Sequence, residues 1–152
     1  MSQKNLGIIG GGQLGSMLSQ AAKKLNIRTT IYSDDVDAPA QNFCDEFIYG
    51  KYDDKKKVLE FVSKVDVITY EFENIPYETL NEMNKLKSVL PKPSVNRLIQ
   101  HRIAEKDFIN KLNIRTTRYV SIEKKTDIET LSDFFPGILK TTTMGYDGKG
   151  QY

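Results

Sequence analysis

Apolar and polar positions near the amino terminus follow the pattern of a strand, a turn and a helix. Residues 6–9 form a short apolar run, residues 10–15 read Gly-Gly-Gly-Gln-Leu-Gly, and apolar side chains then recur every three to four positions. This order opens a βαβ unit, in which the helix lays one apolar face on a sheet. The residues expected on that face are Leu18, Ala21, Ala22 and Leu25.

Further along the chain, β-prone stretches alternate with helical ones, which favours a parallel α/β sheet. The remaining strands are expected over residues 28–32, 47–49, 66–70 and 88–90. One connecting helix has Asp53 as its expected N-cap, and another covers residues 76–86 with Pro76 in its first turn. The inner face of the helix that follows Asp53 should consist of Val58, Leu59, Phe61, Val62 and Val65.

Two prolines, at positions 91 and 93, disfavour the continuation of helix or strand and indicate a domain boundary. We therefore expect a first domain over residues 1–93 and a second over residues 94–152. The elements expected in the second are a helix capped by Ser94 that ends at Ile99, a helix over 102–112, a strand over 118–121 and a helix over 127–134.

Three basic residues of the second domain lie in patterned positions. Arg102 and Lys106 are four apart and so are neighbours on one helix face, which by default is a solvated basic surface. Lys140 ends an extended segment in which it shares a side with Ile138, so its ammonium group would need an anionic partner on an apolar surface.

Composition narrows the class of protein. The chain has 152 residues, of which 39% are hydrophobic and 28% charged, as in soluble globular proteins. Its net charge of +2 gives no general attraction to nucleic acid or membrane, and no apolar stretch suits a membrane span or a signal peptide. We expect a cytoplasmic protein. A single cysteine, Cys44, and a single histidine, His101, argue against a disulfide, a multi-cysteine metal site and a hydrolase triad.

The first glycine turn is a candidate anion site, because free N–H groups and the positive end of the helix dipole meet there. Asp34 follows it by roughly the 20 residues at which a dinucleotide-binding fold places its ribose-binding acid. Glu71 and Glu73 leave the carboxyl end of the strand over residues 66–70. Their carboxylates either accept hydrogen bonds from the hydroxyl groups of a sugar or belong to a solvated acidic loop.

The flap, residues 145–151, is a second glycine-rich segment. It contains Gly145, Gly148 and Gly150, with Lys149 among them, and could close over a polyphosphate. An ordinary hairpin explains the same residues, since Asp147 followed by Gly148 is a favoured turn pair, and both readings can hold. The spacing differs from that of a Walker loop.

Together these blocks resemble the N5-carboxyaminoimidazole ribonucleotide synthases, which are ATP-grasp ligases of the ATPase-subunit type of phosphoribosylaminoimidazole carboxylase. The matching blocks are residues 10–15, 37–40 and 69–74, Arg102 with Glu105 and Lys106, and residues 145–151. The resemblance covers nearly the whole chain in order. It implies an α/β fold, with a Rossmann-like (pre-ATP-grasp) parallel sheet domain that binds substrate, followed by the start of an ATP-grasp domain with a glycine-flap hairpin.

The resemblance also implies a reaction in purine biosynthesis. ATP and bicarbonate give carboxyphosphate, and its carboxyl group passes to the amine of 5-aminoimidazole ribonucleotide, leaving ADP and phosphate. The implied cofactors are ATP and Mg²⁺, with the metal ligands outside this chain and none within it. Relatives suggest a homodimer.

Site residues follow from matching positions. ATP is expected to contact Arg102, Lys140, Gly145, Tyr146, Asp147, Gly148, Lys149, Gly150 and Gln151. The residues expected to face the reacting centre are Tyr146, Asp147 and Lys149. Those expected to hold the ribonucleotide are Gly12, Gln13, Leu14 and Glu73.

The sequence departs from the family pattern in two places. Relatives usually carry an arginine and a second glycine just before the flap, where this chain has Thr142, Thr143 and Met144. Only Gln151 and Tyr152 follow as a returning strand, so we expect the amino-terminal portion of a longer enzyme, unable to turn over ATP alone.

Three other functions remain open. A nicotinamide-dependent oxidoreductase would use Gly10, Gly12, Gly15 and Asp34, but leaves everything after residue 93 unexplained. A non-catalytic nucleotide-binding or regulatory module is the second alternative. The third is an ATP-grasp ligase that acts on another purine precursor.

Overall fold

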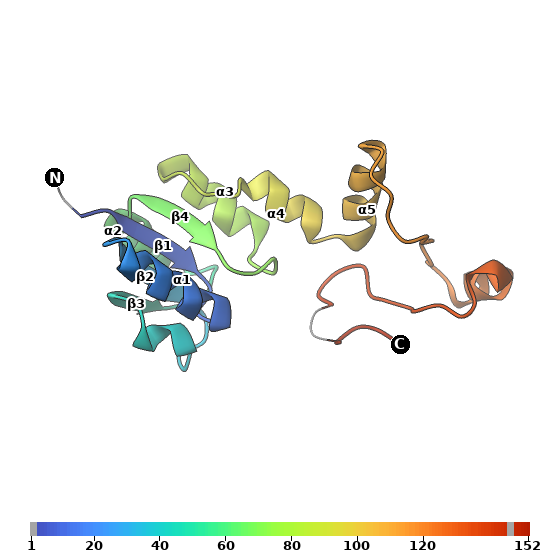
Figure 1. Cartoon of the computed structure of the whole chain (residues 1–152), viewed down its shortest axis with the longest axis horizontal. Helices are drawn as coiled ribbons and strands as arrows, with labels where there is room; N and C mark the ends of the chain where they lie inside the picture. Colours follow the sequence, from blue (N-terminus) through green and yellow to red (C-terminus); the bar gives the residue numbers. More distant parts are fainter. Residues whose placement is uncertain (1–2, 146–147) are drawn as a thin grey trace. The chain divides into compact units, whose positions relative to one another are not determined.

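The computed structural model describes residues 3–145 and 148–152, and the chain forms two compact units that divide between Arg97 and Leu98 (Figure 1). The first unit is built on a parallel sheet. Among its described residues, the second contains one regular helix of ten residues, α5, and is otherwise made mainly of short turns and loops.

The sheet of the first unit has four parallel strands in the order β3-β2-β1-β4, which confirms the predicted α/β fold. The strands are β1 (Asn5–Ile9), β2 (Arg28–Ser33), β3 (Glu46–Tyr49) and β4 (Val67–Tyr70). In this register Ile9 lies beside Tyr32 on one side and Tyr70 on the other. The strand predicted over residues 88–90 is reduced to one bridge between Val89 and Ile68, because Pro91 has no N–H group to extend the ladder.

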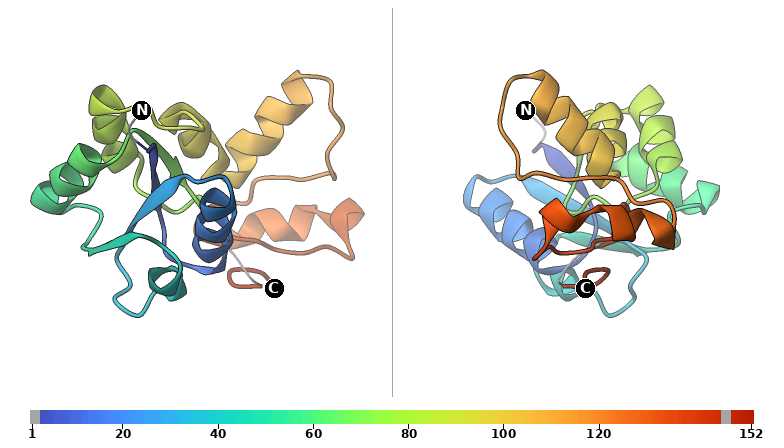
Figure 2. Two further views of the ribbon diagram at one scale, coloured as in Figure 1. Left: turned by 60° about the vertical axis from the view of Figure 1, so that its left-hand side comes forward. Right: turned by 90° about the vertical axis from the view of Figure 1, so that its right-hand side faces the viewer.

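Helices cover both faces of the sheet (Figure 2). One face carries α1 (Gln13–Lys24) and the short helix η1 (Pro39–Asn42), and the other carries α2 (Lys55–Lys64) and α3 (Tyr77–Leu86). The connections from β1 and from β4 therefore leave the sheet on different faces. Such a switch point is where open α/β sheets bind ligands, at the carboxyl ends of the strands.

Helix α1 packs through small residues, which corrects the predicted apolar face. Its buried residues are Gly15, Ser16, Ser19 and Ala22. Of the predicted set only Ala22 is buried, whereas Leu18 and Leu25 are 38% and 72% exposed. The reason is close approach, since a Cβ atom at Gly15 would lie 2.8 Å from the carbonyl oxygen of Gly10. Large side chains do not fit in this gap.

Helix α2 supplies most of the larger core. Its N-cap is Asp54, which accepts hydrogen bonds from the N–H groups of Lys56 and Lys57, so the predicted cap at Asp53 is wrong by one residue. Leu59 is 56% exposed and does not belong to the inner face. The buried positions follow the helical repeat, from Val58 to Phe61 and Val62 one turn later, and Leu59 lies outside this repeat. The other four predicted residues are buried: Val58, Phe61, Val62 and Val65.

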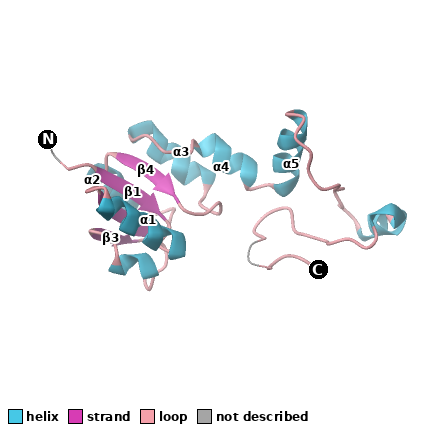
Figure 3. Ribbon diagram, in the orientation of Figure 1, coloured by secondary structure: helices cyan, strands magenta, loops and turns pink. Residues whose placement is uncertain are grey.

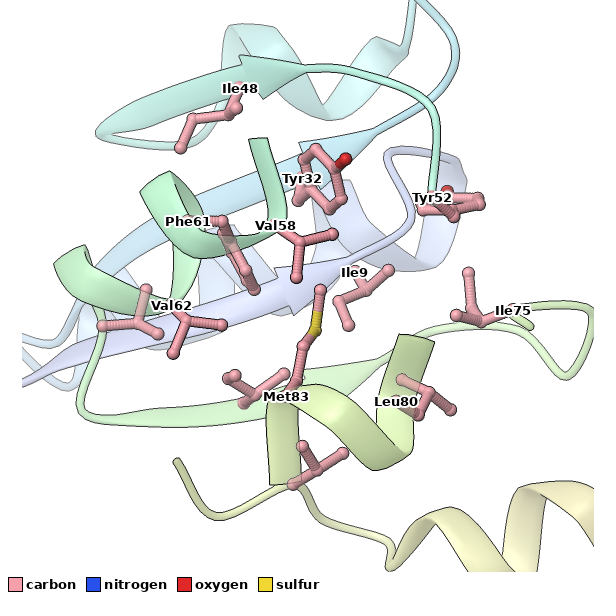
Figure 4. Close-up of a cluster of buried hydrophobic side chains, with 13 residues drawn as sticks. Ile9, Tyr32, Ile48, Tyr52, Val58, Phe61, Val62, Ile75, Leu80 and Met83 are labelled. Carbon is pink, nitrogen blue, oxygen red and sulfur yellow. The ribbon is translucent and has the colours of Figure 1, made fainter. Parts of the chain in front are cut away.

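The core is centred on Phe61, whose ring stacks on Tyr32 with centroids 5.5 Å apart. Figure 4 shows Leu80 and Met83 of α3 pointing toward this cluster from below the sheet. Close packing continues to β1, since a Cβ atom at Gly7 would lie 2.7 Å from Cζ of Phe61. The helix predicted over residues 76–86 is therefore present as α3, with Pro76 as its N-cap instead of in its first turn.

The division between the units falls within α4 (Pro93–Ile99), and Ser94 lies inside this helix instead of capping it. The helix predicted over residues 102–112 is present in the second unit as α5 (Arg102–Lys111). Residues 118–121 form loop, which corrects the predicted strand, and the helix predicted over 127–134 is two short turns, η2 (Lys125–Thr130) and η3 (Ser132–Phe134) (Figure 3).

Side-chain contacts explain both differences. Arg118 lies over the ring of Phe134 at 4.8 Å from its centroid, in place of pairing with a neighbouring strand. The carboxylate of Asp127 accepts hydrogen bonds from the N–H groups of Glu123 and Lys124, which bends the chain back at the start of η2. In the described part of the chain, no helix is both long enough and apolar enough to cross a membrane.

A buried phenol makes the stability of the first unit depend on pH. The hydroxyl of Tyr32 donates a hydrogen bond to the carbonyl oxygen of Lys51 at 2.5 Å. Burial, followed by the charge of Asp54, raises the pKa of Tyr32 to about 12. Burial raises the pKa of Tyr52 as well. A tyrosine of the unfolded chain ionises near pH 10, so the folded state keeps a proton that the unfolded state has lost.

We therefore expect stability that is complete below pH 10 and falls between pH 10 and 12, by up to about 1.4 kcal/mol per pH unit for each such tyrosine. Urea unfolding followed by far-UV circular dichroism at pH 9, 10 and 11 measures the slope. Tyr32→Phe should reduce it, and Tyr49→Phe, at a 49% exposed position, is the matched control. An unchanged slope in Tyr32→Phe would contradict the assignment.

Candidate functional site

The first candidate site lies at the switch point between β1 and β4. The glycine turn follows β1, and Glu71 follows β4 directly. The N–H group of Gly12 donates a hydrogen bond to Oε1 of Glu71 at 2.9 Å, and the N–H group of Glu71 donates to the carbonyl oxygen of Ile9 at 3.0 Å. A carboxylate is therefore fixed against the glycine turn.

Two glycines of the turn are required by this carboxylate. Gly10 has φ +98°, a conformation that side chains disfavour, and a Cβ atom there would lie 2.4 Å from Cγ of Glu71. A Cβ atom at Gly12 would lie 2.9 Å from Oε1 of Glu71. The glycines thus permit Glu71 to approach the backbone.

The segment over residues 37–40 packs against the other side of the turn. A Cβ atom at Gly11 would lie 2.5 Å from Cβ of Ala38, and the N–H group of Ala40 donates to the carbonyl oxygen of Gly11 at 3.0 Å. Ala38 and Ala40 are both buried. Three sequence blocks separated along the chain therefore meet at one place in the first unit.

The structure places Gly12, Gln13 and Leu14 at the start of α1, where Gly12 is the N-cap and Leu14 is 54% exposed. Glu71 is the carboxylate that contacts this turn, whereas the family resemblance implies Glu73 as the residue that holds the ribonucleotide. Glu73 follows two positions later in the same loop and is half-buried. The strand end at Tyr70 agrees with the prediction, but the i, i+2 spacing of the pair held no signal for which of the two carboxylates contacts the glycine turn.

Asp34, the candidate ribose-binding acid, directly follows β2. Burial, followed by the charge of Asp34, raises the pKa of the Tyr52 phenol, so the carboxylate of Asp34 lies near this ring.

The second candidate site lies in the second unit, around the flap. Residues 139 and 152 exchange both backbone hydrogen bonds, at 3.0 and 2.8 Å, and Lys140 pairs with Gln151 in an antiparallel bridge. The N–H group of Thr141 donates to the carbonyl oxygen of Gly150 at 2.8 Å. These bonds join the segment that precedes the flap to the carboxyl end of the flap.

A pocket with a volume of about 200 Å³ opens beside the flap. Its lining residues are Arg102, Lys140, Gly145, Gly148, Lys149, Gly150 and Gln151. Three cationic side chains among them make the pocket suitable for phosphate oxygens. Its volume is below the roughly 300–1,000 Å³ of pockets that hold whole cofactors. The structure thus brings together the residues predicted to bind ATP, apart from Tyr146 and Asp147, which lie outside the described residues.

Arg102 and Lys106 of α5 make separate contacts, which corrects the predicted solvated face. Arg102 contacts the residues before the flap, through its backbone N–H and its guanidinium group. Lys106 donates to the carbonyl oxygen of Thr117 at 3.2 Å and lies 5.0 Å from the ring centroid of Tyr119. The apolar surface expected around Lys140 is not formed either, because Ile138 is 71% exposed.

Within residues 3–145 and 148–152, no group of three or more His, Cys, Asp or Glu side chains is arranged to hold a metal ion. Cys44 is half-buried, and burial raises the pKa of its thiol.

Comparison with known proteins identifies relatives of this arrangement. Residues 3–100 match the model of the ribonucleotide synthetase preATP-grasp domain. The chain is 39% identical over 150 residues to the N5-carboxyaminoimidazole ribonucleotide synthase of Staphylococcus aureus strain COL, covering 96% of this chain and 40% of the relative. It is also 39% identical over 148 residues to the bifunctional purine synthesis protein purC/E of Dictyostelium discoideum, covering 96% of this chain and 15% of that protein.

Among solved structures, the chain resembles the crystal structure of N5-carboxyaminoimidazole synthetase from Staphylococcus aureus complexed with ADP. The TM-score is 0.89 at 36% sequence identity, and the match covers 97% of this chain and 40% of that one. The chain therefore spans about two-fifths of the length of these synthases, and a smaller part of the bifunctional protein.

Proposed function

Because this chain belongs to the ribonucleotide synthetase preATP-grasp domain family, we propose that it is the amino-terminal part of an N5-carboxyaminoimidazole ribonucleotide synthase. The complete enzyme is an ATP-grasp ligase of purine biosynthesis. It uses ATP and bicarbonate to form carboxyphosphate and transfers the carboxyl group to the amine of 5-aminoimidazole ribonucleotide, releasing ADP and phosphate. Residues 1–93 form its substrate-binding domain, and residues 94–152 begin its ATP-grasp domain.

The observation that carries this proposal is the contact between Gly12 and Glu71. In a dinucleotide-binding fold, the second glycine of the turn lets the backbone approach the pyrophosphate, and an acid after the second strand holds the ribose. Here the carboxylate of Glu71 takes the place beside that glycine. The site that a pyrophosphate would occupy is therefore filled by the protein itself, which favours a mononucleotide substrate over NAD.

We assign roles to the residues of the first site on this basis. The exposed first turn of α1, at Gln13 and Leu14, offers backbone N–H groups and the positive end of the helix dipole to the substrate phosphate. Oε1 of Glu71 accepts a hydrogen bond from the N–H group of Gly12. The second carboxylate oxygen of Glu71 accepts a hydrogen bond from a hydroxyl group of the ribonucleotide. Glu73, in the same loop, contributes a second carboxylate.

In the second unit, Lys140, Lys149 and the flap backbone bind the phosphates of ATP. The relative of known structure binds ADP, which supports a nucleotide at the corresponding part of this chain. We further propose that Tyr146, Asp147 and Lys149 face the reacting centre. In this proposal Mg²⁺ is held by ligands outside the described residues, and the enzyme is a cytoplasmic homodimer.

Calorimetric titration of this chain with 5-aminoimidazole ribonucleotide and, separately, with NAD⁺ tests the proposal. Only the ribonucleotide should bind. Glu71→Gln keeps the shape of the side chain, removes its charge and should weaken ribonucleotide binding about tenfold. Glu78→Gln, at an exposed position of α3, is the matched control. Binding of NAD⁺ without binding of the ribonucleotide would refute the proposed function.

A further inference from the structure

Asn96 is a polar residue in the core of the first unit that has no role in the sites described above. Its side chain is fully buried, and only Pro93 is buried beside it in α4. Nδ2 of Asn96 donates a hydrogen bond to the carbonyl oxygen of Ile75 at 3.1 Å. Ile75 belongs to the buried core (Figure 4), so the bond joins α4 to the chain that follows β4.

The substrate loop, residues 71–75, follows β4 and carries both candidate carboxylates of the first site. It is held at both ends. At its start, the N–H group of Glu71 donates a hydrogen bond to the carbonyl oxygen of Ile9 at 3.0 Å. At its end, the bond from Asn96 fixes the carbonyl group of Ile75.

The next residue of α4 makes a second contact at the same end of the loop. The guanidinium group of Arg97 lies over the ring of Tyr77, 4.8 Å from its centroid. Asn96 and Arg97 therefore contact the chain on the two sides of Pro76, which has no N–H group of its own to fix this junction. Helix α4 thus holds the point at which the substrate loop passes into α3.

The amide oxygen of Asn96 indicates that stability is not the reason for this residue. Oδ1 is buried, and it has no hydrogen-bond partner among residues 3–145 and 148–152. A buried acceptor without a partner costs about 1–3 kcal/mol, which offsets the roughly 0.5–1.5 kcal/mol that a hydrogen bond contributes. Net stabilisation therefore does not explain an asparagine here, whereas the fixed end of the substrate loop does.

We propose that Asn96 is a positioning residue for the ribonucleotide, because it fixes the end of the substrate loop and thereby the placement of Glu73. Asn96 acts through the carbonyl group of Ile75 and does not contact the substrate. The inference rests on the proposed function, in which Glu73 is a carboxylate that holds the ribonucleotide.

NMR of the whole chain without ligand tests the positioning. Asn96→Leu removes the donor with little change in side-chain shape, so the amide signals of residues 72–75 should lose intensity through microsecond-to-millisecond exchange. Thr79→Val is the matched control, since it removes another buried hydrogen bond to a backbone carbonyl oxygen, from Oγ1 of Thr79 to Tyr52 at 2.7 Å. It should leave these signals unchanged.

Asn96→Ala, which cannot overfill the site, is measured in parallel and should behave like Asn96→Leu. The amide signal of Ile8 in β1 reports whether each variant remains folded. Unchanged signals of residues 72–75 in both Asn96 variants would overturn the inference. An equal loss of signal in Thr79→Val would overturn it as well, because the effect would then be one of general destabilisation.

Calorimetric titration with 5-aminoimidazole ribonucleotide adds a functional readout. Asn96→Leu should weaken binding about tenfold, and Thr79→Val should not. Adding Asn96→Leu to Glu73→Gln should cause little further loss, because both changes act through the same carboxylate. A fully additive loss would contradict the inference. Failure of the wild-type chain to bind the ribonucleotide would count against the proposed function, and the loop signals would still decide whether Asn96 fixes the loop.

Discussion

Gly10→Ala should lower the free energy of unfolding of the first unit by about 2–5 kcal/mol. Positive φ at a residue with a side chain costs about 1–3 kcal/mol, and forcing an extra methyl group into a filled space costs about as much again. Both apply at this position, where φ is +98° and the new Cβ atom would lie 2.4 Å from Cγ of Glu71. Urea unfolding followed by far-UV circular dichroism measures the loss.

Two matched variants separate the cost of the positive φ from the cost of the steric overlap with Glu71. Gly148→Ala has φ +78° with its nearest neighbour 3.5 Å away, so it should show the backbone cost alone in the second unit. Adding Gly10→Ala to a Glu71→Ala background removes the overlap but keeps the strained φ, and should therefore cost about half as much as in the wild type. A loss below about 1 kcal/mol for Gly10→Ala would mean that the turn has another conformation.

Lys140→Ala in the full-length synthase should reduce bicarbonate-dependent release of ADP by roughly 10²–10³-fold. Removing a charged donor that stabilises developing negative charge has an effect of this size when the site excludes water. Lys140 lines the phosphate-sized pocket together with Arg102 and Lys149. Few other positive charges among the described residues of this pocket can replace it.

The measurement is steady-state ADP release with and without bicarbonate at saturating ribonucleotide. Lys111→Ala removes an exposed lysine from the last turn of α5 and should leave the rate unchanged. Retention of wild-type activity in Lys140→Ala would require a different assignment for this lysine, and would favour a non-catalytic role for the second site.

Much of the fold was predictable because its signals are local. Apolar runs bounded by turn residues gave β1 to β4, and the helical spacing after Pro76 and after Arg102 gave α3 and α5. The family resemblance rests on blocks of the same kind. These features depend on residues a few positions apart, so an isolated sequence contains them in full.

The errors concern contacts between elements. Leu18 and Leu25 have the spacing of a buried face, yet α1 lies so close to the turn that only small residues fit beneath it. The strand predicted over residues 118–121 had suitable residues but no neighbouring strand, and Arg118 packs on Phe134 instead. The spacing of apolar residues along a helix shows that one face is apolar. It does not show how closely that face approaches the neighbouring element, and so it does not show which side chains fit there.

The sequence by itself determined the order of strands and helices, the two glycine-rich segments and the family to which the chain belongs. Only the tertiary structure decided that Glu71 is the carboxylate on the first glycine turn. The two residues of that hydrogen bond are 59 positions apart, and they meet because β1 pairs with β4 in the register that sets Ile9 beside Tyr70. The next residues along both strands, Gly10 and Glu71, are then neighbours, whereas a register shifted by two residues would have brought Glu73 to the same place.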